Sequence, residues 1–252
     1  MKLLIIKKKH IRILALVLCI ALILIYNLLK QFRTMPVSYL PISNKIIAID
    51  PGHGGVDPGA VSKNGIKEDE INLAISLKLK RLIEQSGGIV FMTRTTDKAL
   101  YTSESKTLRQ MKTEDLKKRK EVIENSGSEI LISIHLNSFT KSSYYGAQTF
   151  YKSGSLEGEK LASIIQEALR NVLDKNNKRQ PQKRDDVYIL NEVSMPAALV
   201  ECGFLSNTIE EKLLVDESYQ EKIAWSIYVG IMNYFNNTNI NHEFWDVDKN
   251  CG

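Results

Sequence analysis

Cysteine is scarce in this chain, and its three copies are scattered. Cys19 lies in an apolar N-terminal run, Cys202 lies in a second apolar segment, and Cys251 is next to the C-terminus. An odd, scattered set argues against a framework of structural disulfides. Cys202 could act as a nucleophile, but its apolar surroundings favour a small residue of a buried strand. The sequence therefore offers no disulfide scaffold and little support for thiol chemistry.

Charge of one sign is also missing from the body of the chain. The formal net charge is +5, from 34 basic and 29 acidic residues. The first twelve positions hold no acid and five basic residues, namely Lys2, Lys7, Lys8, Lys9 and Arg12. Without these five, 29 basic residues stand against 29 acidic ones. A nucleic-acid-binding protein would carry a basic surplus, so we expect no nucleic-acid partner.

One long apolar run follows this basic start, over residues 13–29 (ILALVLCIALILIYNLL). Its length reaches the lower limit for a membrane-spanning helix and exceeds the apolar core of a usual signal peptide. The following KQFRTMPVSYLP lacks a cleavage site made of small residues. Because positive charge precedes the run, we expect residues 1–12 in the cytoplasm, a transmembrane signal-anchor over 13–29, and the remainder exported. A cleaved signal peptide is the alternative.

The rest of the chain has no visible internal repeat or low-complexity tract and alternates strand-like with helix-like segments. After a linker over residues 30–44, strand patterns cover residues 45–49, 89–93, 129–134, 147–151, 187–190 and 197–202. Helical patterns cover residues 69–85, 114–125, 156–173 and 217–235, and Asn207 with Glu210 fits a capping box that opens a short helix. This alternation predicts a single α/β domain over 45–236, with a twisted, mostly parallel or mixed sheet of about six strands and helices on both faces. Residues 237–252 are predicted to form a loose polar tail.

Histidine occurs four times, and two copies follow apolar strands. His53 ends IIAIDPGH and His135 ends ILISIH. Ligands of α/β sheets bind beyond the carboxyl ends of strands, so the two imidazoles can converge on a zinc ion, although either alone could be a loop or core histidine. A catalytic zinc site has a third protein ligand. Glu68, Asp69 and Glu70 are all candidates, but acids at a helix N-terminus are also favoured without any metal.

Glu201 ends the apolar segment AALVE, where a charge is costly unless it has a partner or a task. We interpret it as the base that takes a proton from an attacking water, with a buried ion-pair partner as the alternative. Asp50 could orient His53. Arg94 and Asn137 are candidates for substrate contact or for fold stabilisation. The long polar stretch over 94–114 is either a wall that sets specificity or a plain surface loop.

Four motifs occur in order along residues 45–235: IAIDPGHGGVDPGA, KEDEINLAIS, ISIHLNS and MPAALVECGFLSN. Together they resemble the zinc-dependent N-acetylmuramoyl-L-alanine amidases of the Amidase_3 family. The resemblance implies His53, Glu68 and His135 as Zn²⁺ ligands and Glu201 as the catalytic glutamate. It favours Glu68 over Glu70 because the family's ligand glutamate lies four residues before an asparagine, here Asn72. Cys202 departs from the family, in which leucine is commoner at that position.

The resemblance also implies the reaction: hydrolysis of the amide between N-acetylmuramic acid and L-alanine in peptidoglycan. The N-terminal run without wall-binding repeats, the YTSESKTLRQMKTEDLKKR insertion and the SIHLNS–GAQTFY region resemble the spore-cortex amidases, which prepare muramic-δ-lactam. We therefore expect a membrane-anchored, extracytoplasmic enzyme of the forespore or spore cortex, with an accessory exported protein left open. The alternatives are a zinc peptidase acting within the stem peptide, against which the absence of H-x-x-E argues, and a non-catalytic wall-binding protein.

Overall fold

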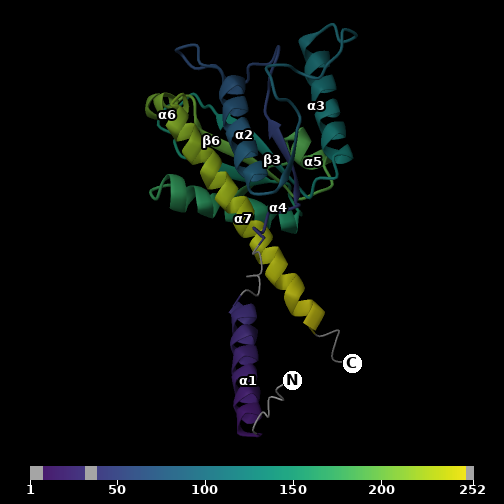
Figure 1. Cartoon of the computed structure of the whole chain (residues 1–252). Coiled ribbons are helices and arrows are strands. Elements are labelled where there is room, and N and C mark those ends of the chain that lie inside the picture. The colour runs from purple at the N-terminus through teal and green to yellow at the C-terminus, as the bar shows by residue number, and fades with distance from the viewer. Residues whose placement is uncertain (1–7, 32–38, 248–252) are drawn as a thin grey trace. The chain divides into compact units, whose positions relative to one another are not determined.

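The computed structural model describes residues 8–31 and 39–247 (Figure 1). The chain divides into two compact units, Met1–Tyr39 and Leu40–Gly252. Three stretches lie outside the described residues: 1–7 of the predicted cytoplasmic segment, 32–38 of the predicted linker, and 248–252 of the predicted tail.

The first unit contains one helix, α1 (Lys8–Gln31). Most apolar side chains over residues 11–26 are exposed, among them Leu14 and Ile23. Within the described part of the chain, no helix combines the length and apolarity needed to cross a membrane. The transmembrane helix predicted over residues 13–29 is therefore not supported.

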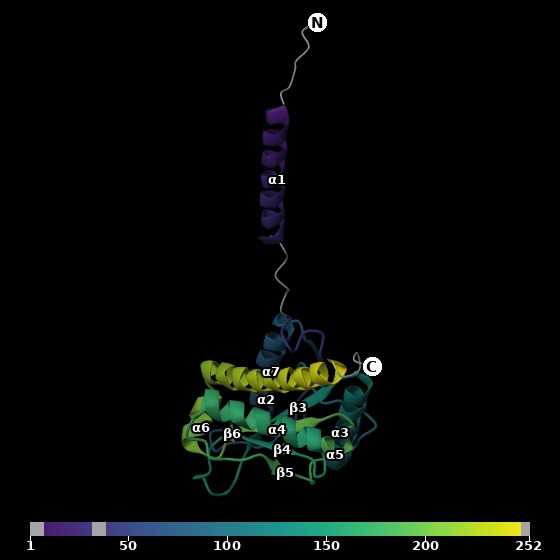
Figure 2. The ribbon, with the colours of Figure 1, turned by 90° about the horizontal axis from the view of Figure 1, so that it is seen from below.

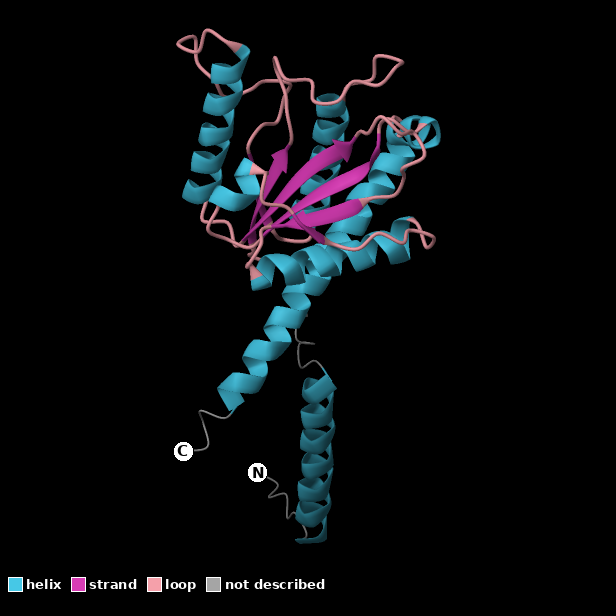
Figure 3. Cartoon of the chain, turned by 180° about the vertical axis from the view of Figure 1, so that it is seen from behind, coloured by secondary structure: helices cyan, strands magenta, loops and turns pink. Residues whose placement is uncertain are grey.

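The second unit is a single α/β domain. Its strands are β1 (Ile46–Pro51), β2 (Ile89–Met92), β3 (Ile130–Asn137), β4 (Gln148–Tyr151), β5 (Gln182–Lys183) and β6 (Ala197–Phe204). Its helices are α2 (Glu68–Gln85), α3 (Leu108–Asn125), α4 (Leu156–Ala168), the π-helical turn η1 (Leu169–Leu173), α5 (Tyr188–Glu192), α6 (Thr208–Leu214) and α7 (Glu217–Val247). The six strands form one sheet in the order β2-β1-β3-β6-β4-β5 (Figure 3). Neighbouring strands are parallel except β4 and β6, which are antiparallel, so the predicted mixed sheet is confirmed.

Alternate side chains of each central strand enter two different cores. On β3, Ile130 and Ile132 belong to a larger core beneath α2, α4 and α7, whereas Leu131 belongs to a smaller core beneath α3 and α5. Figure 2 shows α4 and α7 side by side over the larger core. Because side chains of a strand alternate with a period of two, His135 lies on the same face as Leu131. The site therefore begins on the side of the sheet that carries the smaller core.

The apolar run at residues 187–190, predicted as a strand, is a helix instead. Residues 188–190 are the first residues of α5, and Ile189 and Leu190 are buried in the smaller core. A short apolar run suits a buried helix as well as a buried strand, and periodicity does not separate the two. The prediction was wrong because this segment packs as a helix on the smaller core of the sheet, a tertiary contact that the local apolar pattern does not reveal.

Two helices are longer than predicted. α3 begins at Leu108 rather than at residue 114, since Thr107 and Gln110 form a capping box. α7 continues to Val247, through residues predicted as a loose tail. The predicted cap at Asn207 is present, because its side chain accepts hydrogen bonds from the backbone of α6. Glu210 does not complete the box; it accepts hydrogen bonds from the backbone N–H of Gly146 and Phe204.

Candidate active site

His53 stands on a tight turn directly after β1. Its φ of 63° lies in the left-handed region, which is uncommon for residues other than glycine. Two neighbouring glycines leave room for the side chains that meet here. A Cβ at Gly52 would collide with the imidazole of His135, and a Cβ at Gly59 would lie 2.6 Å from a carboxylate oxygen of Glu68. Glycine is thus required by close approach at positions 52 and 59.

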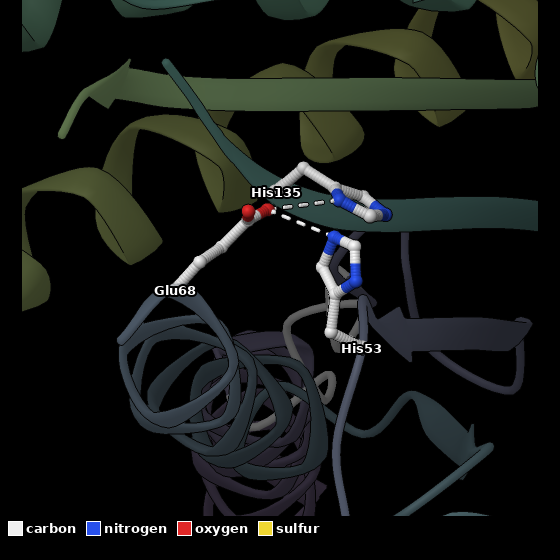
Figure 4. A group of neighbouring side chains, drawn as sticks. All are labelled: His53, Glu68 and His135. Carbon is white, nitrogen blue, oxygen red and sulfur yellow. Dashed lines mark hydrogen bonds and ion pairs between the residues drawn. The ribbon is translucent and has the colours of Figure 1, made fainter. Parts of the chain in front are cut away.

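The carboxylate of Glu68 faces both histidines from one side (Figure 4). Its Oε1 is 3.4 Å from Nε2 of His53 and 3.1 Å from Nδ1 of His135. One ligand atom from each of the three side chains lies within 4.8 Å of the others. The loop after β1, the first turn of α2 and the end of β3 therefore bring together the three side chains that the sequence predicts as metal ligands.

The three acids at the start of α2 have different surroundings. Glu68 is 3% exposed and faces the histidines, whereas Glu70 is exposed and pairs with Lys67 at 3.2 Å. Asp69 is buried, and its Oδ1 has no hydrogen-bond partner in the described part of the chain. A helix-terminal preference explains all three acids, but it does not explain why only Glu68 turns toward both imidazoles.

Hydrogen bonds fix the orientation of these groups. Asp57 lies 2.9 Å from Nδ1 of His53, which leaves Nε2 facing Glu68. The carboxylate of Glu68 accepts hydrogen bonds from the backbone N–H of Ala60 and Leu136. Burial alone would lower the pKa of His53, but the hydrogen bonds to Asp57 and Glu68 outweigh it and raise the pKa to about 10. The same imidazoles hold the pKa of Glu68 well below its ordinary value despite burial.

The residues fit a zinc ion. Two imidazole nitrogens and one carboxylate form a donor set that zinc hydrolases use. His53 has the carboxylate partner that metal-bound histidines usually have on their second nitrogen. A dication would displace the extra proton that the raised pKa lets His53 hold in its absence, because ligand histidines bind as neutral groups.

Glu201 lies beside this cluster. It pairs with His135 in the register of β6 and β3. Its side chain is largely buried, Arg184 donates to its Oε1 at 3.2 Å, and its Oε2 has no hydrogen-bond partner within the described residues. Burial raises the pKa of Glu201 above its ordinary value. His53, Glu68, His135 and Glu201 all line one cavity of about 450 Å³.

Helix α3 contributes a buried polar stripe that the sequence reasoning missed. Arg119 is 1% exposed; it donates to Asp50 at 2.8 Å, to Asp115 at 2.7 Å and to the carbonyl oxygens of Pro51 and His53. The spacing of Lys112, Asp115 and Arg119 on one helical face was the available signal. Asp50, predicted as the residue that orients His53, instead accepts hydrogen bonds from Thr93, Arg119 and Ser133. The carboxylate at Nδ1 of His53 is that of Asp57.

The remaining predicted residues differ in whether they line the cavity. Arg94 is buried and donates to the carbonyl oxygens of Pro51, Gly52 and Asp69, which is a fold-stabilising position. Asn137 lines the cavity. Of the stretch 94–114, only Lys112 on α3 lines it, so the loop before α3 contributes no wall to this cavity.

Known proteins share this architecture. Residues 47–233 match the Amidase_3 family, described as N-acetylmuramoyl-L-alanine amidase. The chain is 41% identical over 196 residues to the germination-specific N-acetylmuramoyl-L-alanine amidase of Bacillus subtilis, a match that covers 78% of this chain and 82% of that protein. The CwlD amidase of Clostridioides difficile, solved in complex with the GerS lipoprotein, matches with a TM-score of 0.75 and 53% identity over 77% of this chain and 99% of that one. An N-acetylmuramoyl-L-alanine amidase from Clostridium difficile 630 matches with a TM-score of 0.66 and 33% identity, over 77% and 98% of the two chains. The chain belongs to the Amidase_3 family of N-acetylmuramoyl-L-alanine amidases.

Proposed function

We propose that this amidase depends on zinc, held by His53, Glu68 and His135, and that Glu201 transfers the proton during cleavage of the bond between N-acetylmuramic acid and L-alanine. One observation carries the proposal. The three candidate ligands converge in a cavity that a buried glutamate with an unpartnered oxygen also lines. The same convergence argues against a non-catalytic wall-binding protein, which would need neither group.

A zinc ion at this position would supply Lewis acidity for the scissile carbonyl and for the attacking water. Arg184 holds Oε1 of Glu201, which leaves Oε2 as the acceptor for the proton of that water. Glu201 then delivers the proton to the nitrogen of the departing L-alanine. Asp57 keeps Nε2 of His53 turned toward the ligand cluster throughout.

A role in the spore cortex is part of the proposal. The likeness to the germination-specific amidase of Bacillus subtilis supports it. Removal of the stem peptide there would be the step that precedes muramic-δ-lactam formation. The proposal also includes export, since peptidoglycan lies outside the cytoplasmic membrane, and an accessory exported protein, which the complex of the Clostridioides difficile relative with a lipoprotein supports. Muropeptides from spores of a deletion strain should lack the lactam, and lactam at the normal level would contradict the cortex role.

Product analysis tests the reaction and the site together. The purified protein with zinc should release stem peptide that begins with a free L-alanine, and a chelator should abolish the release. Glu201→Gln should lower the rate by about 10² to 10⁴-fold, the range of general acid–base catalysis, while bound zinc stays at the wild-type level.

Three outcomes would decide against parts of this proposal. Full activity of the Glu201→Gln protein would remove Glu201 from the reaction. Full activity after verified removal of zinc would remove the metal. Products in which L-alanine remains on muramic acid would instead favour a zinc peptidase that cuts within the stem peptide.

A further inference from the structure

A second cavity, of about 400 Å³, adjoins the one that contains the candidate zinc site. The two cavities share Asn137, Ser138 and Arg184 in their linings. The two cavities are therefore neighbours on either side of Arg184, close enough for one extended substrate to reach both.

The two cavities differ in charge. The first is lined by six acids: Asp50, Asp57, Glu68, Asp115, Asp186 and Glu201. The second is lined by two arginines, Arg179 and Arg184, and otherwise by uncharged side chains. The lining of the second cavity contains no acid and is thus suited to an anionic group, whereas the six acids of the first outnumber its three cations, Lys112, Arg119 and Arg184.

Arg179 is a partly buried cation that no carboxylate contacts directly within the described residues; Glu210 acts on it only through its longer-range charge. It donates to the carbonyl oxygen of Tyr145 and to Oε1 of Gln148, both at 2.7 Å, and its guanidinium lies 4.4 Å from the ring centroid of Phe204. Within the described residues it forms no ion pair, and its Nη2 donates no hydrogen bond. An arginine has five N–H donors in a planar fork. This fork is therefore held in place with donors to spare, an arrangement that suits a carboxylate.

The position of Arg184 indicates which half of the substrate reaches this cavity. Arg184 contacts Glu201, the residue proposed to protonate the leaving L-alanine nitrogen. The peptide side of the scissile bond must then lie toward Arg184, with the glycan on the opposite side of the zinc site. The peptide also carries the free carboxylates, whereas the glycan presents mainly hydroxyl and acetamido groups.

We infer that the second cavity is a subsite for the carboxylate of the acidic residue that follows L-alanine in the stem peptide, bound by Arg179 and Arg184. This inference rests on the proposed function, because it uses the direction in which the peptide leaves. The subsite would make the enzyme sensitive to amidation of that carboxylate, a modification that removes its charge.

The test uses the full-length protein with zinc and two synthetic muropeptides that differ only in this carboxylate, free in one and amidated in the other. Wild-type kcat/KM should be about tenfold higher for the free acid, the equivalent of one charge-assisted contact. Arg179→Gln should reduce that ratio toward one, and Arg179→Lys should retain part of it because the point charge remains. Lys178→Gln is the matched control: it removes one exposed charge next to Arg179 but outside the second cavity, and should leave the ratio unchanged.

A second variant keeps the test decisive if Arg179→Gln does not fold. Gln182 is exposed on β5 and lines the second cavity, so Gln182→Glu adds a repelling charge without disturbing a buried contact. It should lower the rate on the free acid more than the rate on the amide. Equal wild-type rates on the two muropeptides, or an equal fall on both in Arg179→Gln and Gln182→Glu, would overturn the subsite and leave the amidase proposal standing. Failure of the wild type to cleave the muramic acid–L-alanine bond in either muropeptide would overturn both.

Discussion

The two faces of the sheet differ in their mixture of buried side chains: both carry an apolar core, but α3 adds buried charged residues to the smaller one. Beneath α2, α4 and α7 the contacts are apolar, with Ile75, Leu79 and Ile227 fully buried. The buried residues of α3, on the other face, are Asp115, Arg119 and a single isoleucine. Apolar contact is non-directional and fixes a shape within wide tolerance. Hydrogen bonds between charged groups are directional, and here they fix the loop that carries His53. The apolar face therefore contributes most of the packing, whereas the charged residues of α3 fix the His53 loop. The first face still takes part in the site, because α2 supplies Glu68.

The largest effect is expected from Arg119→Met. It leaves Asp50 and Asp115 buried without their cation, which should cost about 3–5 kcal/mol in the free energy of unfolding. It also removes the donor to the carbonyl oxygen of His53, so zinc affinity should fall as well. Chemical unfolding and competitive zinc titration measure the two effects. Arg109→Met, an exposed change on the same helix, should affect neither, and unchanged zinc affinity in Arg119→Met would show that α3 only stabilises the fold.

A core substitution on the apolar face should act on stability alone. Leu79→Ala empties a fully buried position on α2 and should cost about 2–5 kcal/mol in the free energy of unfolding. Zinc affinity and activity per folded molecule should match the wild type under conditions where the variant remains folded. A loss of zinc affinity like that of Arg119→Met would mean that the two faces are not separable in this way.

Asp57→Asn should lower zinc affinity, which Leu79→Ala should leave unchanged. It weakens the partner that orients His53, and such partners typically contribute about 10–100-fold to metal affinity. Zinc titration should detect this loss. The metal-free protein should also lose stability below the raised pKa of His53, because the carboxylate that raises this pKa is gone. Asp97→Asn is the control, since Asp97 accepts a hydrogen bond from the backbone N–H of Gly55 and does not contact the imidazole. Equal zinc affinities for the two variants would contradict the orienting role of Asp57.

The smallest effect is expected at the exposed end of the polar stripe. Lys112 lies 2.7 Å from Asp57, but its side chain is 51% exposed. Lys112→Gln should therefore change the free energy of unfolding by no more than about 1 kcal/mol, and added salt should reduce even that difference. Urea unfolding at low and high ionic strength measures it. A loss of stability that persists in high salt would show that Lys112 contributes like the buried Arg119 and not like an ordinary surface charge.

The strands of the sheet could be predicted because their signal is local. Central strands of a sheet covered on both faces are continuous apolar runs, and β1, β3 and β6 are of this kind. The same signal failed at residues 187–190, where an equally apolar run forms α5. β5 was not predicted, because its two residues, Gln182 and Lys183, are exposed and carry no apolar pattern.

Within the site, the residues flagged in advance are those with an unusual local setting. His53 and His135 follow apolar strands, and Glu201 is an acid inside one. Arg119 and Asp57 had no such setting. Arg119 contacts Asp50, which lies 69 positions earlier in the chain, and the local sequence around either residue does not reveal this contact.

The sequence by itself determined the alternation of strands and helices, and it determined which chemical groups stand where the strands end. Both follow from periodicity and apolarity over a few residues. The local pattern left Glu68, Asp69 and Glu70 open, and only the family resemblance favoured Glu68; the tertiary structure shows that Glu68 turns toward the two histidines and that Arg119 holds the backbone of the His53 loop. Those choices depend on the packing of α2 and α3 against opposite faces of one sheet, and contacts between segments so distant in the chain leave no trace in a local pattern.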